Sequence, residues 1–392
     1  MSVEIAPVAG RRDLDRFLHL PWRIYRRSHQ WVPPLLDHQR HLLDRRHPFH
    51  RHADVELFLA RRRGVVVGRI AAIVNHRHVA VHDEPVGFFG FFESAPDGEV
   101  TAALLEAAEH WLGVRGMRAM RGPMSFSTNE ECGMLVDGFE AAPAFMMPYN
   151  PPYYPKLMEQ AGLRKAVDLL TYRGGRDSVT PHRRENLERL AERVRRHLAA
   201  DIRVPDLRRF DDELAQITAV YHRAWSRNWG FVPMTDEEIA ELGAQLRPLV
   251  DPELIRTASV GGLPVGVGLM LPNYNEPIKH LNGRLWPFGA PYILASRYLR
   301  RIRGTRLLML GVVPEYQRRG LDALLLHELY DAALRRGYDW CEVGWVLEEN
   351  HVMNNAIRSW GLDLSARYRV YERAFAAGQA SAAGSTMPPD PD

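Results

Sequence analysis

The strongest fold signal in this chain is the segment Val312-Val313-Pro314-Glu315-Tyr316-Gln317-Arg318-Arg319-Gly320-Leu321-Asp322-Ala323. It follows an apolar run, 307–310, and precedes a helical pattern that continues to residue 336. This order of strand, tight loop and helix places two arginines and a glycine where a helix begins. Free backbone N–H groups and the positive end of the helix dipole converge there, so the loop is predicted to hold a phosphate.

The loop resembles the acyl-CoA-binding loop of the GCN5-related N-acetyltransferases (GNATs), whose pattern is Gln or Arg, two residues, Gly, one residue, then Gly or Ala. Gln317, Arg319 and Gly320 match it. Asp322 departs from it, because the family has Gly or Ala there. Pointing outward, its carboxylate would complement the helix dipole by about 0.3–1 kcal/mol, whereas pointing inward it would repel a pyrophosphate.

The resemblance also implies the residues of an acyl-CoA site. A backbone N–H of the preceding strand, in Gly311-Val312-Val313, would hold the thioester carbonyl as it becomes an oxyanion. The residues assigned to acyl-CoA are Val312, Val313, Gln317, Arg318, Arg319, Gly320, Leu321, Asp322 and Asn350. A tyrosine of a late helix often protonates the leaving thiolate in this family, and Ile357 occupies its slot here. Acyl-CoA would be a co-substrate, with no tightly bound cofactor.

Composition bounds the class of protein. The chain has 392 residues, of which 46% are apolar and 25% charged, as expected for a soluble globular protein of about two to three domains. A formal net charge of +3 is too small to make nucleic acid the default partner. Two cysteines without CxxC spacing argue for a reducing compartment and against a zinc site.

No membrane span or signal peptide is expected. Arg69 interrupts the best apolar run, Val65 to Val74, and the N-terminus lacks a basic region followed by an apolar one. The predicted location is the cytoplasm, with peripheral contact at the inner membrane left open. The His- and Arg-rich segment 38–52 reads as a solvated helix and loop, and no metal site is predicted.

The chain repeats itself at an offset close to 200 residues. The matching sets are Gly64, Val67, Gly68 and Asn75 in the first half, and Gly262, Val265, Gly266 and Asn273 in the second. In the first half, 94–99 occupies the phosphate-loop position but contains two acids and no arginine, which indicates a degenerate copy. The predicted fold is α/β, with two tandem GNAT-like domains, each a mixed, mostly antiparallel sheet flanked by helices.

The predicted domains are 1–175, a degenerate GNAT-like domain that binds substrate, and 176–375, a GNAT domain with the acyl-CoA loop. Residues 173–185 read as the linker between them, and 376–392 as a disordered tail.

Acyl transfer to an amine also needs a base. Glu348 and Glu276 are preferred because they follow the strands nearest the loop, and Glu130 is a candidate if the halves share a cleft. Each could instead be an ordinary loop carboxylate or cap.

Aromatic and Met residues are concentrated in the first half, where they would suit an apolar channel. The residues predicted to bind substrate are Phe88, Phe91, Met146, Tyr153 and Trp229. Four further segments carry a wider resemblance: Asn129-Glu130-Glu131-Cys132, Tyr149-Asn150-Pro151-Pro152-Tyr153-Tyr154, 228–233 and 368–372. With them the chain looks, over nearly its whole length, like long bacterial acyl-CoA N-acyltransferases of the ceramide synthase type. This resemblance implies a long-chain acyl-CoA donor and a sphingoid-base amine as acceptor. Two alternatives stay open: a GNAT-fold transferase that uses a carrier protein or an aminoacyl-tRNA, and a non-catalytic protein that binds acyl-CoA or a partner.

Overall fold

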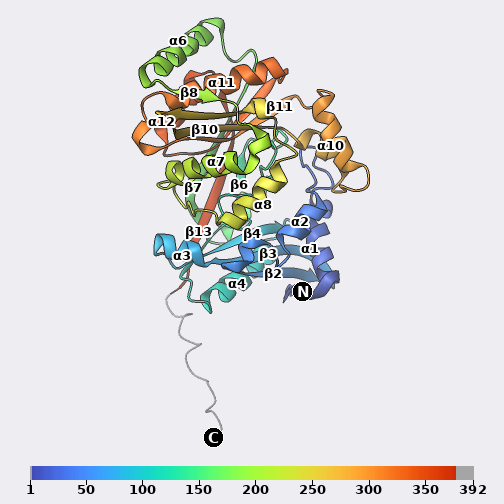
Figure 1. The fold of residues 1–392 in the computed structure, drawn as a ribbon. Coiled ribbons are helices and arrows are strands. Elements are labelled where there is room, and N and C mark those ends of the chain that lie inside the picture. Colours follow the sequence, from blue (N-terminus) through green and yellow to red (C-terminus); the bar gives the residue numbers. More distant parts are fainter. Residues whose placement is uncertain (1, 377–392) are drawn as a thin grey trace.

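The computed structural model describes residues 2–376, and a single mixed sheet of 13 strands runs through them (Figure 1). The strands are β1 (Glu4–Pro7), β2 (Ala53–Arg62), β3 (Val65–Asn75), β4 (Val86–Ser94), β5 (Ala119–Gly122), β6 (Met134–Asp137), β7 (Arg164–Gly175), β8 (Asp201–Arg203), β9 (Ile255–Val260), β10 (Leu263–Pro272), β11 (Gly304–Val312), β12 (Trp340–Leu347) and β13 (Asp363–Ala374). The predicted tail lies outside the described residues except for Ala376.

Helices cover both faces of this sheet. They are α1 (Gly10–Ile24), α2 (Leu36–Leu42), α3 (His76–His82), α4 (Gly98–Gly113), α5 (Tyr154–Gln160), α6 (Pro181–Leu198), α7 (Phe210–Trp225), α8 (Asp236–Leu246), α9 (Asn275–Ile278), α10 (Gly289–Tyr298), α11 (Leu321–Arg336) and α12 (His351–Ser359). The predicted α/β class and the mostly antiparallel sheet flanked by helices are confirmed.

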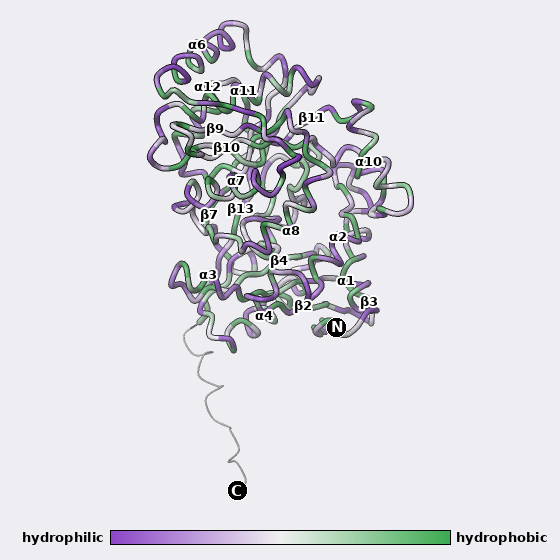
Figure 2. The backbone as a smooth tube through the Cα atoms, in the orientation of Figure 1, coloured by the Kyte–Doolittle hydropathy of each residue, from purple (hydrophilic) through white to green (hydrophobic). Residues whose placement is uncertain are grey.

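The sequence repeat has a physical cause in helix packing. A Cβ on Gly68 of β3 would lie 2.7 Å from Leu104 of α4, and one on Gly266 of β10 would lie 3.0 Å from Leu325 of α11. Each half therefore keeps a glycine where its long helix crosses the second strand of its hairpin. Figure 2 shows the hydropathy of each residue along the backbone in the same view.

The two halves exchange their last strands. The strand order is β1-β2-β3-β4-β5-β13-β7-β12-β11-β10-β9-β8, with β6 also paired to β13. The C-terminal strand β13 thus lies between β5 and β7, and β7 of the first half pairs with β12 of the second. The connection between halves is shorter than predicted, because β7 continues to Gly175 and α6 begins at Pro181.

Each half contains one parallel strand pair that opens toward its carboxyl end. In the second half β11 and β12 pair only from Gly304 to Leu307, although β11 continues to Val312. In the first half β4 and β5 pair from Val86 to Phe88. The predicted phosphate loop follows β11 directly, so it lies at the open end of its strand pair.

Candidate functional site

The loop after β11 is folded tightly onto the start of α11. A short 3₁₀ turn spans Pro314–Tyr316, and Arg318 and Gly320 both have left-handed backbones, with φ of 59° and 82°. The Gln317 side chain donates to the carbonyl of Val312 at 3.0 Å, so it braces the loop. A Cβ on Gly320 would lie 2.8 Å from Cγ2 of Val194 in α6. Glycine is therefore required here both for its backbone freedom and for its size.

The N-terminus of α11 is open to an anion. Its N-cap residue is Gly320, and no side chain caps the helix. The first N–H groups of a helix have no partner inside it, so those of Leu321 to Ala323 face outward with the positive end of the dipole. The side chains of Arg318 and Arg319 are exposed beside them. This cluster of donors and cations fits a phosphate or pyrophosphate.

The equivalent helix of the first half is closed by its own side chains. The Asp97 carboxylate caps α4 by accepting from the N–H groups of Glu99 at 3.0 Å and Val100 at 3.4 Å. Arg62 pairs with both Asp97 and Glu99. The donors that an anion would need are occupied, and negative charge surrounds them. The two halves therefore differ in whether the N–H groups at the start of the long helix are free to bind a phosphate.

The backbone of β11 distinguishes between the two valines proposed as donors. The N–H of Val313 donates to the carbonyl of Val265 in β10 at 2.9 Å, so it is already used. Successive N–H groups of a strand point to opposite edges. The N–H of Val312 therefore points toward β12, on the side where the two strands have separated. The geometry favours Val312 as the oxyanion donor.

Glu276 and Glu348 lie in positions that serve the fold. Glu276 accepts from the N–H groups of Arg303 at 2.8 Å and Gly304 at 2.9 Å, where β11 begins. The predicted phosphate loop follows the other end of this strand, about 30 Å away for nine residues at about 3.3 Å each. Glu348 accepts from Lys165 at 2.6 Å and from the N–H of Asp168 at 3.0 Å. Neither arrangement favours a role as base.

Glu130 lies between the two halves, which is the condition on which its candidacy depended. It lines a cavity of about 30 Å³, room for about two water molecules. The walls are formed by Leu42, His47, Phe49, Phe126, Ser127 and Asn129 of the first half, and by Met234, Glu238, Glu241, Leu242 and Gln245 at α8 of the second. Burial, reinforced by the carboxylates of Glu131 and Glu238, raises the pKa of Glu130 to about 8. The carboxylate form of a group with such a raised pKa is a stronger base than an ordinary carboxylate.

A chain of contacts joins the Glu130 loop to the end of β11. Asn129 accepts a hydrogen bond from Tyr221 of α7 at 2.8 Å. The Tyr221 ring lies 5.5 Å from that of Trp225, and Trp225 covers Gly311 so closely that a Cβ there would be 2.1 Å from its ring. The first half thus contacts, through Asn129, the helix that covers the predicted thioester position.

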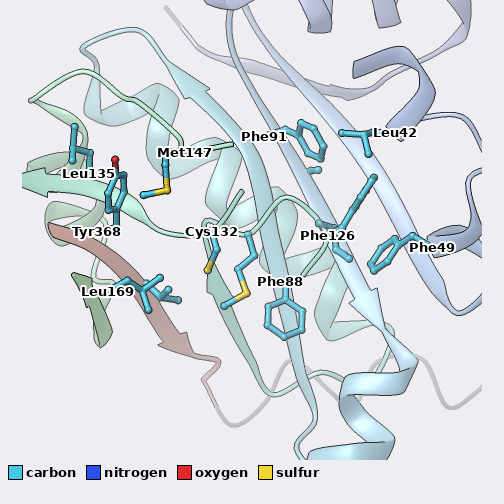
Figure 3. Packing of buried hydrophobic residues seen from close by; sticks show 14 of the residues in the cluster. Leu42, Phe49, Phe88, Phe91, Phe126, Cys132, Leu135, Met147, Leu169 and Tyr368 are labelled. Carbon is cyan, nitrogen blue, oxygen red and sulfur yellow. The ribbon is translucent and has the colours of Figure 1, made fainter. Parts of the chain in front are cut away.

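Three of the five predicted substrate-binding side chains lie together. Phe88 and Trp229 line a second small cavity, and Phe91 packs 5.5 Å from Phe126, which borders both cavities (Figure 3). Strict alternation along β4 would place Phe88 and Phe91 on opposite faces. A backbone irregularity at Phe91, with φ of 49°, returns both rings to the same cluster.

The other predicted residues lie elsewhere. Met146 belongs to a different cluster, at β9 and β10, and Tyr153 lies on the α4 face, where its hydroxyl donates to Ser94 at 2.8 Å. Asn350 caps α12 by accepting from the N–H of Met353 at 3.2 Å. Ile357, in the slot of the family tyrosine, is fully buried.

Among residues 2–376 no group of three or more His, Cys, Asp or Glu side chains could hold a metal ion.

Two curated proteins resemble the chain over nearly its full length. Protein YghO of Escherichia coli (strain K12) is 35% identical over 368 residues, which cover 93% of each chain. The bacterial ceramide synthase of Caulobacter vibrioides (strain NA1000 / CB15N) is 34% identical over 382 residues, which cover 95% of this chain and 98% of that protein. No family model matches the sequence.

Solved structures show the same fold at low sequence identity. A tandem GNAT protein from the clavulanic acid biosynthesis pathway aligns with a TM-score of 0.55 and 13% identity, covering 95% of this chain and 98% of that one. A glucosamine N-acetyltransferase region of a fungal multi-domain GH3 β-N-acetylglucosaminidase aligns with a TM-score of 0.57 and 14% identity, covering 95% of this chain and 38% of that one. Within residues 2–376, no helix is long and apolar enough to cross a bilayer.

Proposed function

Since the chain belongs to the tandem GNAT family that includes the bacterial ceramide synthase, we propose that it transfers an acyl group from acyl-CoA to a primary amine. The observation that carries the proposal is the contrast between the two long helices: α11 is uncapped and flanked by arginines, whereas α4 is capped by Asp97. CoA is therefore held by the second half alone.

In the proposed reaction the amine nitrogen attacks the thioester carbonyl, and a C–N bond forms while a proton passes from nitrogen to the Glu130 carboxylate. The N–H of Val312 stabilises the oxyanion. The C–S bond then breaks and CoA leaves as a thiolate, a stable enough leaving group to depart without an acid. This accounts for the apolar Ile357 in the place of the family tyrosine.

The proposed substrates are a long-chain acyl-CoA and an amphipathic amine such as a sphingoid base. Support comes from the relative named bacterial ceramide synthase and from the apolar cluster of Phe88, Phe91, Phe126 and Trp229 beside Glu130. The cavity of about 30 Å³ is too small for an alkyl chain, so the halves must separate locally when one binds. A buried chain contributes about 0.8 kcal/mol per CH₂, which would drive this opening.

Turnover of acetyl-, octanoyl- and palmitoyl-CoA, with a sphingoid base and with a small polar amine, tests the proposal. We expect kcat/KM to rise steeply with chain length and to favour the sphingoid base. Equal values for acetyl- and palmitoyl-CoA would contradict the lipid assignment and leave a general N-acyltransferase. CoA binding without turnover would favour an acyl-CoA-binding protein, and acylation only from carrier protein or aminoacyl-tRNA would favour the other alternative.

A further inference from the structure

A protruding segment of the second half, residues 279–303, exposes four large apolar side chains. Trp286 is 69% exposed, Phe288 81%, Tyr298 73% and Leu299 60%. These residues flank and end α10, which lies at the side of the molecule near α2 (Figure 1). Exposed apolar residues that gather on one element mark an interaction surface.

The exposed residues are additional to those that hold α10 on the protein. Gly289, Ile293 and Ser296 are buried and recur every three to four residues, so they form the face that packs on the core. The preceding turn is fixed to the first half, because Asn282 accepts from Trp22 at 2.7 Å and Gly283 accepts from the N–H of Leu36 at 3.0 Å. The four exposed apolar side chains therefore lie on a segment that is fixed to the rest of the protein.

The segment that carries these apolar side chains is also strongly basic. Residues 279–303 carry Lys279, Arg284, Arg297, Arg300, Arg301 and Arg303 and no acidic residue. Arg297 is used within the fold, where it donates to the carbonyl of Val250 at 2.7 Å, and Arg303 pairs with Asp339. Lys279, Arg284, Arg300 and Arg301 are exposed. The chain as a whole has a net charge of only +3, so this concentration of positive charge is local.

We propose that residues 279–303 dock the protein on an anionic phospholipid membrane, with Trp286, Phe288, Tyr298 and Leu299 entering the interface and the exposed cations contacting lipid phosphates. Trp and Tyr suit the boundary between headgroups and acyl chains, and Lys and Arg are attracted to the negative surface of anionic lipids. The inference goes beyond the proposed reaction and does not depend on it, because binding can be measured without turnover.

Sedimentation of the full-length protein with vesicles tests the docking surface. We expect stronger binding to vesicles of phosphatidylcholine with phosphatidylglycerol than to phosphatidylcholine alone, and weaker binding at high salt. The double variant Trp286→Ser/Phe288→Ser should lower the partition coefficient at least about tenfold. Arg300→Gln/Arg301→Gln should remove most of the preference for anionic lipid. Leu263→Ser is the matched control, since Leu263 is 69% exposed at the start of β10, and it should bind like the wild type.

The thermal unfolding midpoint of each variant should match that of the wild type. This control distinguishes a variant that has lost lipid contacts from one that has not folded. Equal binding of wild type and Trp286→Ser/Phe288→Ser would overturn the proposal, as would equal affinity for the two vesicle types. A wild-type protein that self-associates through this surface, and becomes monomeric on the double substitution without binding vesicles, would also overturn it in favour of a protein interface.

Discussion

Replacing Gly320 by alanine is expected to weaken CoA binding about 5- to 30-fold. Gly320 has φ of 82°, and a non-glycine residue in this region costs about 1–2 kcal/mol, which corresponds to that factor. The added Cβ would also lie 2.8 Å from Cγ2 of Val194. The free loop can escape this strain by changing conformation, but CoA must restore the converging N–H groups, so the cost appears in the binding constant.

The matched control is Gly337→Ala, at the other end of the same helix. Gly337 has φ of 86°, so the backbone penalty is similar, and its nearest neighbour would be Nη1 of Arg300 at 3.8 Å. We expect Gly337→Ala to lower the free energy of unfolding by about 1–2 kcal/mol while calorimetry shows wild-type CoA affinity. The variant Val194→Ala/Gly320→Ala removes the contact and leaves only the backbone term. The assignment of the loop fails if Gly320→Ala binds CoA as tightly as Gly337→Ala does.

Further expectations concern the base, Asp322 and the stoichiometry. Glu130→Gln should lower kcat/KM about 10²- to 10⁴-fold with unchanged CoA affinity. Glu348→Gln should mainly lower the free energy of unfolding. Similar losses of kcat/KM in both variants would contradict the assignment of Glu130 as the base. Because the pKa of Glu130 is raised to about 8, its ionised form increases as pH rises toward 8, so kcat/KM should rise over pH 6–8 and Glu130→Gln should lose this limb. Asp322→Ala should change CoA affinity less than tenfold, or about 1.4 kcal/mol; a larger gain would mean that the carboxylate opposes phosphate. Calorimetry should give one CoA per chain, and two sites would contradict the closed first half.

Local sequence patterns were sufficient for the loop, the long helices and the repeat. Gly320 and the helix after it are specified by neighbours within a few residues, so they could be predicted. The cavity around Glu130 could not, because His47 and Phe126 of the first half meet Glu238 of the second only after folding. Glu130 could be named from the sequence only on the condition that the two halves share a cleft, and residues of α8 form the second wall of that cavity.

The pairing of β4 shows a different limit. Alternation predicts faces correctly only in a regular strand, and the irregularity at Phe91 has no sequence signal such as a glycine at that position. Glu276 and Glu348 are near the right strands in sequence, which is why the sequence favours them as bases. Their hydrogen bonds at 2.6–3.0 Å, from the start of β11 to Glu276 and from Lys165 and Asp168 to Glu348, depend on which end of each strand they reach.

Because the halves exchange their last strands, the first half cannot complete its sheet until the C-terminal strand has been synthesised. Domains usually fold from the N-terminus during synthesis. Here β5 and β7 lack their common neighbour until β13, the last strand, has been made. The nascent first half therefore carries unpaired strand edges through most of translation, one on β5 and both on β7, whose other neighbour is β12. Such edges invite association with other chains. A chain that ends at residue 362 should aggregate rather than accumulate as a folded fragment. The first half cannot be deleted without removing β5 and β7, the two strands between which β13 of the second half lies.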